Sequence, residues 1–508
     1  MIPLVQKVAG WFLKRRIEHV EQFMRHPHET QERVFHELIE KARHTRWGSH
    51  HGYEDIHTID QFRSQVPVSP YEALYPWIEM ELKGESDILW PGRTQWFARS
   101  SGTTNDKSKY IPVSQESLDD CHYKAGQDML AVYFHNKPDS KLFTGKSLSI
   151  GGSHSHSPLS KHARCGDVSA VILENLPSFY EMVRAPSKEV ALMPNWEEKL
   201  PVMAREVMHD DVTALVGVPT WTLALAHRLL DEAKSSSRNL LDIWPNLELY
   251  VHGGVNFEPY RAQFESLIPS PFMSYLDCYN ASEGFFGFQH ERERRDLLLL
   301  LDYGIFYEFI PVEDIDQEHP RTFVLGEVET GKNYAMLIST NAGLWRYLIG
   351  DTLMFTSTDP YTVRVTGRTK QFINLFGEEL MVDNAEVALS EACRQTGAQI
   401  ENFTVGPIFP EQTVQGGHEW LIEFAVMPDT MEHFSYLLDS RLKELNSDYE
   451  AKRVGDIALR PPRIVVLPRG TFHEWMKKRG KLGGQHKVPR LANHRQYVDD
   501  ILAMPALL

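Results

Sequence analysis

The pattern of apolar residues changes three times along this chain, and each change marks a different kind of structure. Apolar positions recur every three to four residues over residues 1–45, which is the spacing of an amphipathic helix. Short strand-like runs then alternate with helical segments, and we expect Lys146–Gly152 and Leu247–Gly254 each to be a buried strand that ends in a glycine pair. Strand-like runs dominate from Tyr275 to about Leu375. This order predicts a large α/β body in which β-sheets are flanked by helices.

The C-terminal part has a different pattern, which predicts a second domain. After residue 376, helices at 383–396 and 430–445 alternate with strands at 420–427 and 462–467. A segment of about 130 residues can bury a core of its own. We therefore predict a large N-terminal domain of residues 1–370 and a small C-terminal α+β domain of residues 371–508. Within the large domain, residues 202–234 are expected to be mostly helical, with an interruption at Gly217-Val-Pro219.

Charge and hydropathy argue against two classes of protein. The chain of 508 residues carries 53 basic and 69 acidic side chains, which gives a formal net charge of −16. A nucleic-acid-binding protein needs a basic face, so an acidic balance argues against a nucleic-acid partner. No run of about 18 apolar residues occurs, and therefore no transmembrane segment is expected.

The cysteines and the N-terminal segment indicate where in the cell the protein is expected. Cys121, Cys165, Cys278 and Cys393 lie far apart and form no CxxC pair, which fits a reducing compartment, so we expect a cytoplasmic protein. The start, MIPLVQKVAGWFLKRR, carries its positive charges after a short apolar stretch, which is not the order of a signal peptide. We expect an amphipathic helix on the body of the protein, with a helix on a membrane surface as the alternative.

A loop rich in hydroxyl groups follows the strand-like WFA near residue 97. Its hydroxyls flank Gly102, and lysines follow them. Such a loop can curl its backbone N–H groups around an anion, and Lys109 adds the charge that a polyphosphate requires. The spacing is not that of the nucleotide loop GxxxxGK[ST]. The alternative is a solvated polar turn. The hydroxyl groups are those of Ser100, Ser101, Thr103 and Thr104.

Three further polar stretches follow strand-like runs. Glu283, in YNASEG, is a carboxylate at a strand end that suits a magnesium ion, and the alternative is a polar strand cap. Asp351, in YLIGD, suits hydrogen bonds to two ribose hydroxyls, and the alternative is a hairpin turn. The last stretch is GRTK, which begins at Gly367 and includes Arg368 and Lys370. Each stretch alone has a structural explanation, but their order is specific.

In this order the stretches resemble the motifs of the adenylate-forming superfamily, which includes acyl-CoA synthetases and luciferases. The stretch SSGTTNDKSKYIP looks like the phosphate loop of the superfamily, and YNASEG looks like its Y-G-x-T-E motif. Similarly, YLIGD looks like the Y-x-T-G-D motif, and GRTKQFINLFGEEL looks like the hinge segment. More narrowly, the chain resembles the GH3 family of acyl acid amido synthetases. ASEGFFGF and the tail stretches LNSDY, PRGTF and GGQHKVPR carry this narrower similarity, which covers about residues 30 to 495.

The resemblance implies a fold and a reaction. The fold would be a large domain that binds ATP and the acyl substrate, followed by a mobile small domain. The reaction would join a small carboxylic acid to ATP with loss of pyrophosphate, and would then pass the acyl group to an amine, expected to be an amino acid. The implied cofactors are ATP and Mg²⁺. Because both reactants are anions, positive charge must gather where they meet.

The resemblance also assigns roles to residues. Glu283 would bind Mg²⁺, Tyr279 would stack on adenine, and Asp351 and Arg368 would hold the ribose. Lys487 in the tail is the candidate for the catalytic lysine, and Lys370 at the hinge competes with it. The other nucleotide-binding candidates are Ser100, Ser101, Gly102, Thr103, Thr104, Lys109, Gly253, Gly254, Asn280 and Ser282. The loop departs from the superfamily pattern at Asn105 and Asp106, where many members have a glycine-containing pair.

Two alternatives remain open at the level of sequence. An acyl-CoA ligase would share the adenylation motifs and differ in the acceptor, and the tail similarity favours the amide. A non-catalytic nucleotide-binding protein would keep the pocket, but the charged residues of these motifs argue against it. Phe179, Tyr180, Val218 and Trp221 suit a pocket for an apolar acid or a buried core, and we expect core.

Overall fold

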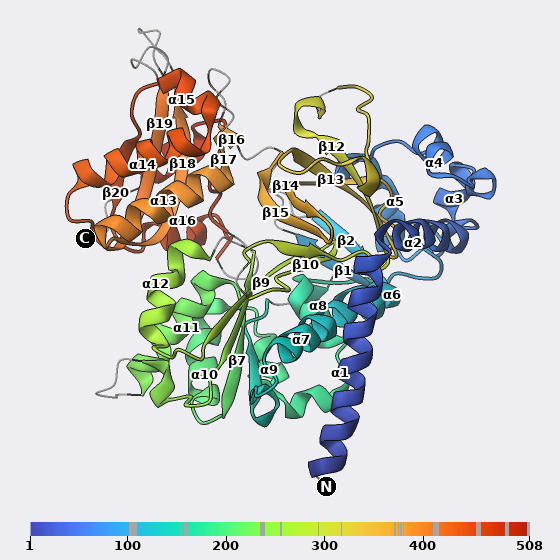
Figure 1. Ribbon diagram of the computed structural model, residues 1–508, viewed down its shortest axis with the longest axis horizontal. Coiled ribbons are helices and arrows are strands. Elements are labelled where there is room, and N and C mark those ends of the chain that lie inside the picture. Colours follow the sequence, from blue (N-terminus) through green and yellow to red (C-terminus); the bar gives the residue numbers. More distant parts are fainter. Residues whose placement is uncertain are drawn as a thin grey trace. The chain divides into compact units, whose positions relative to one another are not determined.

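The computed structural model divides into two compact units (Figure 1). The first consists of residues 1–218, 241–254 and 272–364, and the second of residues 219–240, 255–271 and 365–508. The structure describes residues 2–100, 109–152, 154–156, 161–233, 239–254, 257–292, 294–315, 317–369, 372–373, 375, 378, 380–409, 416–453, 459–482 and 487–504.

A mixed sheet of eleven described strands forms the centre of the first unit, in the order β12-β13-β14-β15-β11-β10-β9-β8-β7-β3-β6. The strands of one half run parallel, because helices connect them. They are β3 (Lys146–Ser149), β6 (Arg184–Ala185), β7 (Val212–Gly217), β8 (Leu249–Gly253) and β9 (Ser274–Ala281). β3 and β8 confirm that both predicted segments contain a strand, and β8 is buried throughout. In β3, however, only Leu148 is buried, and the strand ends at Ser149, before the glycine pair.

The prediction for residues 202–234 is partly wrong. Helix α10 (Trp196–Val207) ends early and β7 follows, before α11 (Pro219–Glu232) begins. β7 has the sequence VTALVG, and its first four residues are buried. A short continuous apolar run of this kind does not distinguish a buried strand from a buried helix by its spacing.

The other half of the large sheet is antiparallel. Its neighbouring strands pair antiparallel, including β11 and β15, which are not consecutive in the chain, and β12 is buried along its whole length. The strands are β10 (Gly284–Phe288), β11 (Leu297–Leu299), β12 (Ile305–Pro311), β13 (Asn333–Thr340), β14 (Tyr347–Thr358) and β15 (Tyr361–Arg368). A smaller sheet has the order β2-β1-β5-β4 and contains β1 (Trp96–Ser100), β2 (Lys109–Val113), β4 (His154–His156) and β5 (Arg164–Gly166).

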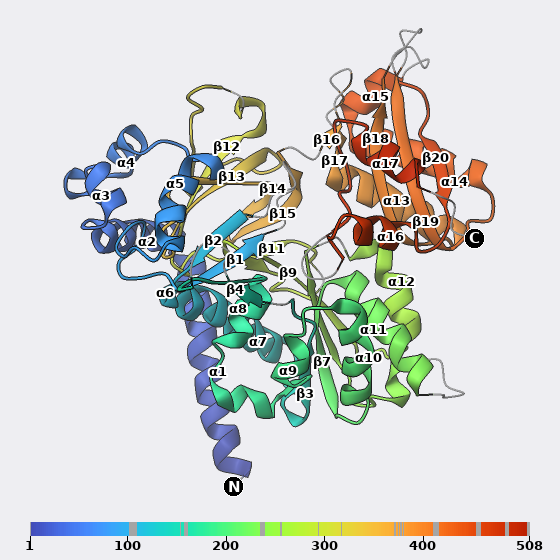
Figure 2. The same cartoon turned by 180° about the vertical axis from the view of Figure 1, so that it is seen from behind.

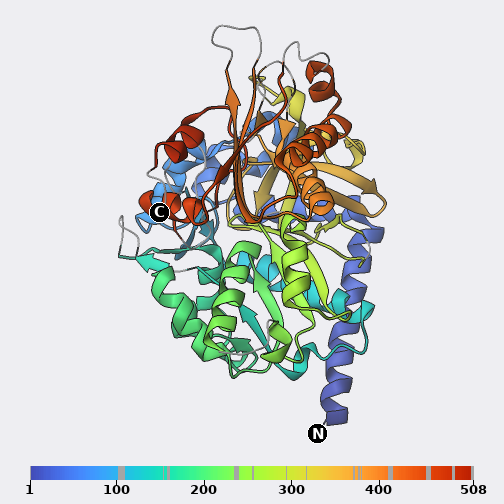
Figure 3. The same cartoon turned by 90° about the vertical axis from the view of Figure 1, so that its left-hand side faces the viewer.

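Two helices form the N-terminal segment that was predicted to be helical. α1 (Ile2–Arg25) ends just before Pro27, the first residue of α2 (Pro27–Ala42), a position that proline tolerates because its missing N–H is not needed there. α1 contacts α7 (Lys124–Asn136), and Figure 3 shows its amino-terminal end extending beyond the rest of the first unit. Among the described helices, none is long and apolar enough to cross a membrane.

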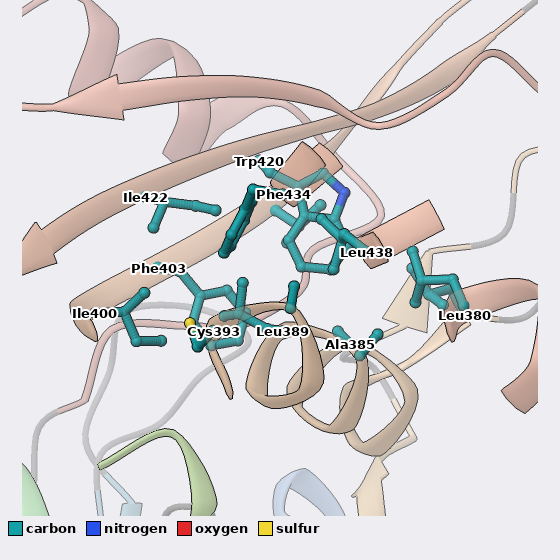
Figure 4. Packing of buried hydrophobic residues seen from close by; sticks show 14 of the residues in the cluster. Leu380, Ala385, Leu389, Cys393, Ile400, Phe403, Trp420, Ile422, Phe434 and Leu438 are labelled. Carbon is teal, nitrogen blue, oxygen red and sulfur yellow. The ribbon is translucent and has the colours of Figure 1, made fainter. Parts of the chain in front are cut away.

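The second unit has an α+β core. Strands β18 (Gln399–Ile408), β19 (Gly417–Val426) and β20 (Arg463–Leu467) form a sheet, which α13 (Val382–Thr396) and α14 (Met431–Leu445) cover (Figure 2). Figure 4 shows Trp420 of β19 among Phe434 and Leu438 of α14, and all three are fully buried. The predicted helices and strands of this region are confirmed, and β18 was not predicted. α11 and α12 (Glu258–Leu267), from the middle of the chain, belong to the same unit.

Candidate active site

The hydroxyl-rich loop is closed by a two-stranded stem. β1 and β2 pair antiparallel from Trp96 opposite Val113 to Ser100 opposite Lys109. The last pair of the stem therefore fixes the two ends of the loop across from each other. Four of the predicted loop residues, Ser101, Gly102, Thr103 and Thr104, lie outside the described residues.

The side chain of Lys109 lies between two tyrosines. Its Nζ donates a hydrogen bond of 3.3 Å to the hydroxyl of Tyr347. The same atom lies 5.4 Å from the ring centroid of Tyr71 and 5.8 Å from that of Tyr347, distances at which an ammonium group is attracted to an aromatic face. The hydroxyl of Tyr71, on α5 (Tyr71–Leu82), also accepts a hydrogen bond of 2.7 Å from the backbone N–H of Tyr110. Lys109 thus connects the loop stem to the start of β14.

Tyr279 and Asp351 are in contact. The Tyr279 hydroxyl donates a hydrogen bond of 2.7 Å to Oδ2 of Asp351, and both side chains are buried. Three strands separate β9 from β14 in the sheet order. Adjacent strands lie about 4.8 Å apart, so four steps across a flat sheet would span about 19 Å. The hydrogen bond therefore requires the sheet to curl, and Figures 1 and 2 both show β14 above β9.

Asp351 does not lie in a hairpin turn, which was the alternative drawn from the sequence. It lies inside β14, where Leu348 pairs with Leu337 and Thr352 pairs with Ala335. From Leu348 to Thr352 the chain of β14 advances four residues, whereas the paired segment of β13 advances only two. The two extra residues on β14 form a bulge. Gly350 has φ +90° there, a backbone conformation that glycine adopts without strain. The bulge lifts the Asp351 segment out of the regular ladder.

Glu283 lies in the tight connection between β9 and β10. Ala281 pairs with Gly284, so Ser282 and Glu283 form a two-residue hairpin loop rather than the cap of a terminating strand. Ser282 is buried, Glu283 is half-buried and Asn280 is exposed. A Cβ at Gly284 would lie 2.7 Å from Cδ1 of Ile305, so this position has room only for glycine unless Ile305 moves.

The chemistry of Glu283 fits Mg²⁺. The ion prefers carboxylate oxygen, and proteins commonly bind it through one or two carboxylates while phosphates and water supply the other ligands. Within the described part of the chain, no cluster of three or more His, Cys, Asp or Glu side chains could hold a metal ion alone. A site with one protein carboxylate, in which a nucleoside triphosphate supplies further oxygen ligands, needs no such cluster.

Backbone geometry explains why two glycines stand at the end of β8. Gly253 pairs with Cys278, and a Cβ at Gly253 would lie 2.5 Å from the carbonyl oxygen of Cys278. Backbone atoms cannot give way as a flexible side chain can. Gly254 has φ +80°, in the left-handed region. The neighbouring strand alone therefore requires glycine at position 253, which is one of the predicted nucleotide-binding residues.

The remaining candidates are less constrained by the structure. Arg368 is the last residue of β15 and is half-buried. Lys487 is exposed and belongs to the second unit, and Lys370 lies outside the described residues. The first unit thus brings Lys109, Tyr279 and Asp351 into one region through Tyr347 and the Tyr279 hydrogen bond. Tyr71 was not predicted, because no motif of the sequence includes it.

The described residues among those considered for an acyl pocket are not in the core. Tyr180, in the 3₁₀ helix Ser178–Met182, is half-buried, and so are Val218 and Trp221. The side chain of Phe179 lies outside the described residues. The expectation that the four form a buried core is therefore wrong for the three that the structure describes.

Comparison with known proteins defines the class and the family. The chain resembles the structure of the acyl acid amido synthetase AtGH3.15 in complex with 2,4-DB, with a TM-score of 0.79 and 17% identity, over 96% of this chain and 95% of that one. It also resembles a 2-hydroxyisobutyryl-CoA ligase in the postadenylation state, with a TM-score of 0.56 and 13% identity, over 96% of this chain and 90% of that one. The fold is that of the adenylate-forming enzymes.

The chain belongs to the GH3 family. It matches the family's N-terminal domain over residues 16–273, its central domain over residues 298–368 and its C-terminal domain over residues 383–496. The indole-3-acetic acid-amido synthetase GH3.3 of Arabidopsis thaliana is 23% identical, over 94% of this chain and 91% of that protein. The 4-substituted benzoates-glutamate ligase GH3.12 of the same plant is 22% identical, over 84% of this chain and 87% of that protein.

Proposed function

We propose that this protein is an ATP-dependent acyl acid amido synthetase, a ligase that forms a carbon–nitrogen bond. It joins a carboxylic acid to AMP with release of pyrophosphate, and transfers the acyl group to an amine, which we propose is that of an amino acid. The observation that carries the proposal is similarity to acid-amido synthetases over 94% of the chain, including the tail. The acid and the amine are the partners that this reaction requires.

Adenylation solves a chemical problem of amide formation. A carboxylate is a poor acyl donor, because its leaving group would be oxide. Attack of the carboxylate oxygen on the α-phosphorus expels pyrophosphate and leaves a mixed anhydride. The amine nitrogen then attacks the acyl carbon, AMP leaves with the bonding electron pair, and the amine loses a proton. The first step brings two anions together, so cationic side chains at that point lower the barrier.

We propose that the loop at Ser100 and the lysine at its end hold the triphosphate. The stem supports this role, because it fixes both ends of the loop, and the two tyrosines hold Lys109 beside it. The loop residues proposed to contact phosphate are Ser100, Ser101, Gly102, Thr103, Thr104 and Lys109. Glu283 would bind Mg²⁺, which, when bound, neutralises phosphate charge.

We further propose that Asp351 and Arg368 bind the ribose and that Gly253 and Gly254 border the adenine. Tyr279, Asn280 and Ser282 complete the nucleotide site in this proposal. The hydrogen bond from Tyr279 supports a second task for this residue, which is to orient the Asp351 carboxylate. Orientation matters because a carboxylate holds two vicinal hydroxyls only when both of its oxygens face them.

The proposed catalytic lysine is Lys487, with Lys370 as the competing candidate. We propose that residues 371–508 act as the main part of a small mobile unit that also contains α11 and α12, so that one active site serves both half-reactions. A disulfide crosslink that locks residues 371–508 to the first unit should abolish one half-reaction and spare the other. Survival of both half-reactions would refute the motion. We also propose a cytoplasmic location, since the four cysteines, all in described segments, form no disulfide.

A panel of carboxylic acids in ATP–pyrophosphate exchange tests adenylation, and a second assay with amino acids or coenzyme A identifies the acceptor. We expect exchange with at least one acid and amide formation with an amino acid. A thioester with coenzyme A and no amide would favour the acyl-CoA ligase, since such ligases share the fold. No exchange with any acid would favour a non-catalytic nucleotide-binding protein.

A further inference from the structure

A buried arginine of the second unit holds the chain just after the proposed catalytic lysine. Arg490 is 7% exposed. Its Nη2 donates a hydrogen bond of 2.9 Å to the hydroxyl of Tyr260, and its Nη1 donates to the carbonyl oxygen of Phe403 at 3.1 Å and to the side-chain oxygen of Asn402. Its Nε lies 3.4 Å from Oε1 of Glu386. The guanidinium group is thus held by α12, α13 and β18.

The backbone around Arg490 is fixed as well. Its carbonyl oxygen accepts a hydrogen bond of 2.8 Å from the N–H of Val405, and the N–H of Ala492 donates to the carbonyl of Val405 at 3.2 Å. The hydroxyl of Thr404 donates to the carbonyl of Pro489 at 2.6 Å. Residues 489–492 therefore lie along the edge of β18 as a short additional strand segment.

Apolar side chains fix the same segment on both sides of the arginine. Val488 lies in the core cluster that contains Trp475, and Leu491 lies in the cluster that contains Trp420. Lys487, by contrast, is exposed. The proposed catalytic lysine thus lies next to the anchored Val488 and three residues before Arg490.

Anchorage alone does not account for an arginine at this place. Burying a guanidinium group is costly unless its donors are satisfied, and a well-packed apolar side chain would hold the segment at a lower desolvation cost. The planar guanidinium group, however, forms directed contacts to several elements at once. It therefore fixes the orientation of the chain segment as well as its position against the core. Its partner Tyr260 lies on α12, which begins four residues after Gly254.

We propose that Arg490 is a positioning residue, which fixes the direction of the chain at Lys487 so that its ammonium group is presented in one place. This inference rests on the proposed function and on the assignment of Lys487 as the catalytic lysine. A residue that acts through Lys487 affects the rate only while that ammonium group is present. The effects of Arg490 and Lys487 should therefore be strongly non-additive.

The test is a double-mutant cycle in ATP–pyrophosphate exchange. We expect Lys487→Met to lower kcat about a hundredfold and Arg490→Met to lower it about tenfold, with the KM for the acid within about twofold of wild type. Added to Lys487→Met, Arg490→Met should lower kcat less than about twofold further. Arg490→Lys keeps the charge but loses the directed contacts, so it should restore little of the rate.

A tenfold loss in both backgrounds would overturn the inference, because Arg490 would then act independently of the lysine. Full exchange by Lys487→Met would overturn the assignment of Lys487 and this inference with it. Absence of exchange by the wild-type protein with every acid would instead overturn the proposed function. These three results are distinct, so the failures can be told apart.

A matched control separates positioning from loss of stability. Arg453 is another buried arginine of the second unit, with its Nε and Nη2 each 2.8 Å from an oxygen of Asp439. Arg453→Met should lower the melting temperature as Arg490→Met does, but should leave kcat of the folded protein unchanged. If Arg490→Met does not fold, Tyr260→Phe removes one of its acceptors. It should lower kcat about threefold in wild type and not at all in Lys487→Met.

Discussion

The hydroxyl of Tyr279 donates a hydrogen bond of 2.7 Å to Asp351, although the strands that carry the two residues are not neighbours in the sheet. The bond connects the YNASEG stretch to the YLIGD stretch. It is possible only because the antiparallel half of the sheet curls. The proposed metal-binding turn and the proposed ribose carboxylate therefore depend on one buried contact.

Tyr279→Phe should raise the KM for ATP about tenfold, with a smaller change in kcat. Removal of the donor takes one hydrogen bond away from a buried carboxylate oxygen, which costs about 1–3 kcal/mol, and weakens the orientation of Asp351. Steady-state kinetics of ATP–pyrophosphate exchange measures the effect. Tyr303→Phe is the control, since Tyr303 makes a buried hydrogen bond of 2.8 Å to Asp128 elsewhere in the same unit. An equal rise in KM in both variants would contradict the prediction.

Replacement of Tyr71 tests the contact between the loop and Lys109. Tyr71→Leu removes one of the two rings beside the ammonium group of Lys109, and with it about 1 kcal/mol of cation–π attraction. The variant should therefore bind ATP about fivefold more weakly. Tyr71→Phe keeps the ring and should bind ATP nearly as wild type does. Calorimetric titration with ATP distinguishes them. Tyr133→Leu, which removes a similar Lys137–Tyr133 contact, should leave ATP affinity unchanged. Equal affinity of the two Tyr71 variants would argue against a role for the ring.

Glu283→Gln should raise the Mg²⁺ concentration needed for half-maximal exchange by about tenfold or more. The amide carries no charge and binds a hard cation less well than a carboxylate does. The measurement is a Mg²⁺ titration at fixed ATP. Glu313→Gln, which alters a glutamate 59% exposed and paired with Lys332, is the matched control. An unchanged Mg²⁺ dependence in Glu283→Gln would exclude Glu283 as the ligand.

Stability should fall as the pH rises through neutrality, partly because of Glu81. Burial raises the pKa of Glu81 from 4.5 to about 7, and this effect outweighs the hydrogen bond of 3.1 Å from the N–H of Leu89. The folded protein therefore holds a proton that the unfolded chain loses near pH 4.5. The raised pKa of Glu81 contributes about 3 kcal/mol to the free energy of unfolding. This contribution is fully present below pH 4.5 and is lost as the pH rises through about 7.

Glu81→Gln tests this dependence, because its side chain does not titrate. Urea unfolding at pH 5 and pH 8 should show a smaller difference in the free energy of unfolding for the variant than for wild type. The acceptor for Leu89 is kept by the amide oxygen. The same pH dependence in both proteins would rule out Glu81 as its source.

Much of the fold could be predicted from local pattern. The buried, glycine-ended run of β8 and the helices α13 and α14 have patterns that the sequence alone reveals. β7 could not be predicted in the same way, because VTALVG is apolar except for Thr213 and has no period to distinguish strand from helix. Helices α11 and α12 were not expected to join the C-terminal residues, since contacts between distant segments leave no local pattern.

The candidate site was predictable as a set of stretches and not as a set of contacts. Motif order pointed to Glu283 and Asp351, and the structure describes both in the first unit. The partners of Lys109 and Asp351 depend instead on how the sheet curls and on where α5 lies. Tyr71 is in a helix without any motif, so only the tertiary structure reveals it.

The bulge in β14 adds two residues, an even number, and this has a consequence for how the strand tolerates change. Tyr347 before it, and Leu353 and Phe355 after it, are all buried, so the inward-facing side of the strand is the same on both sides. An insertion or deletion of one residue would exchange inside for outside along half of β14. Changes of length at this place should therefore survive only in pairs of residues, because only an even number keeps Tyr347, Leu353 and Phe355 on the buried side of the strand.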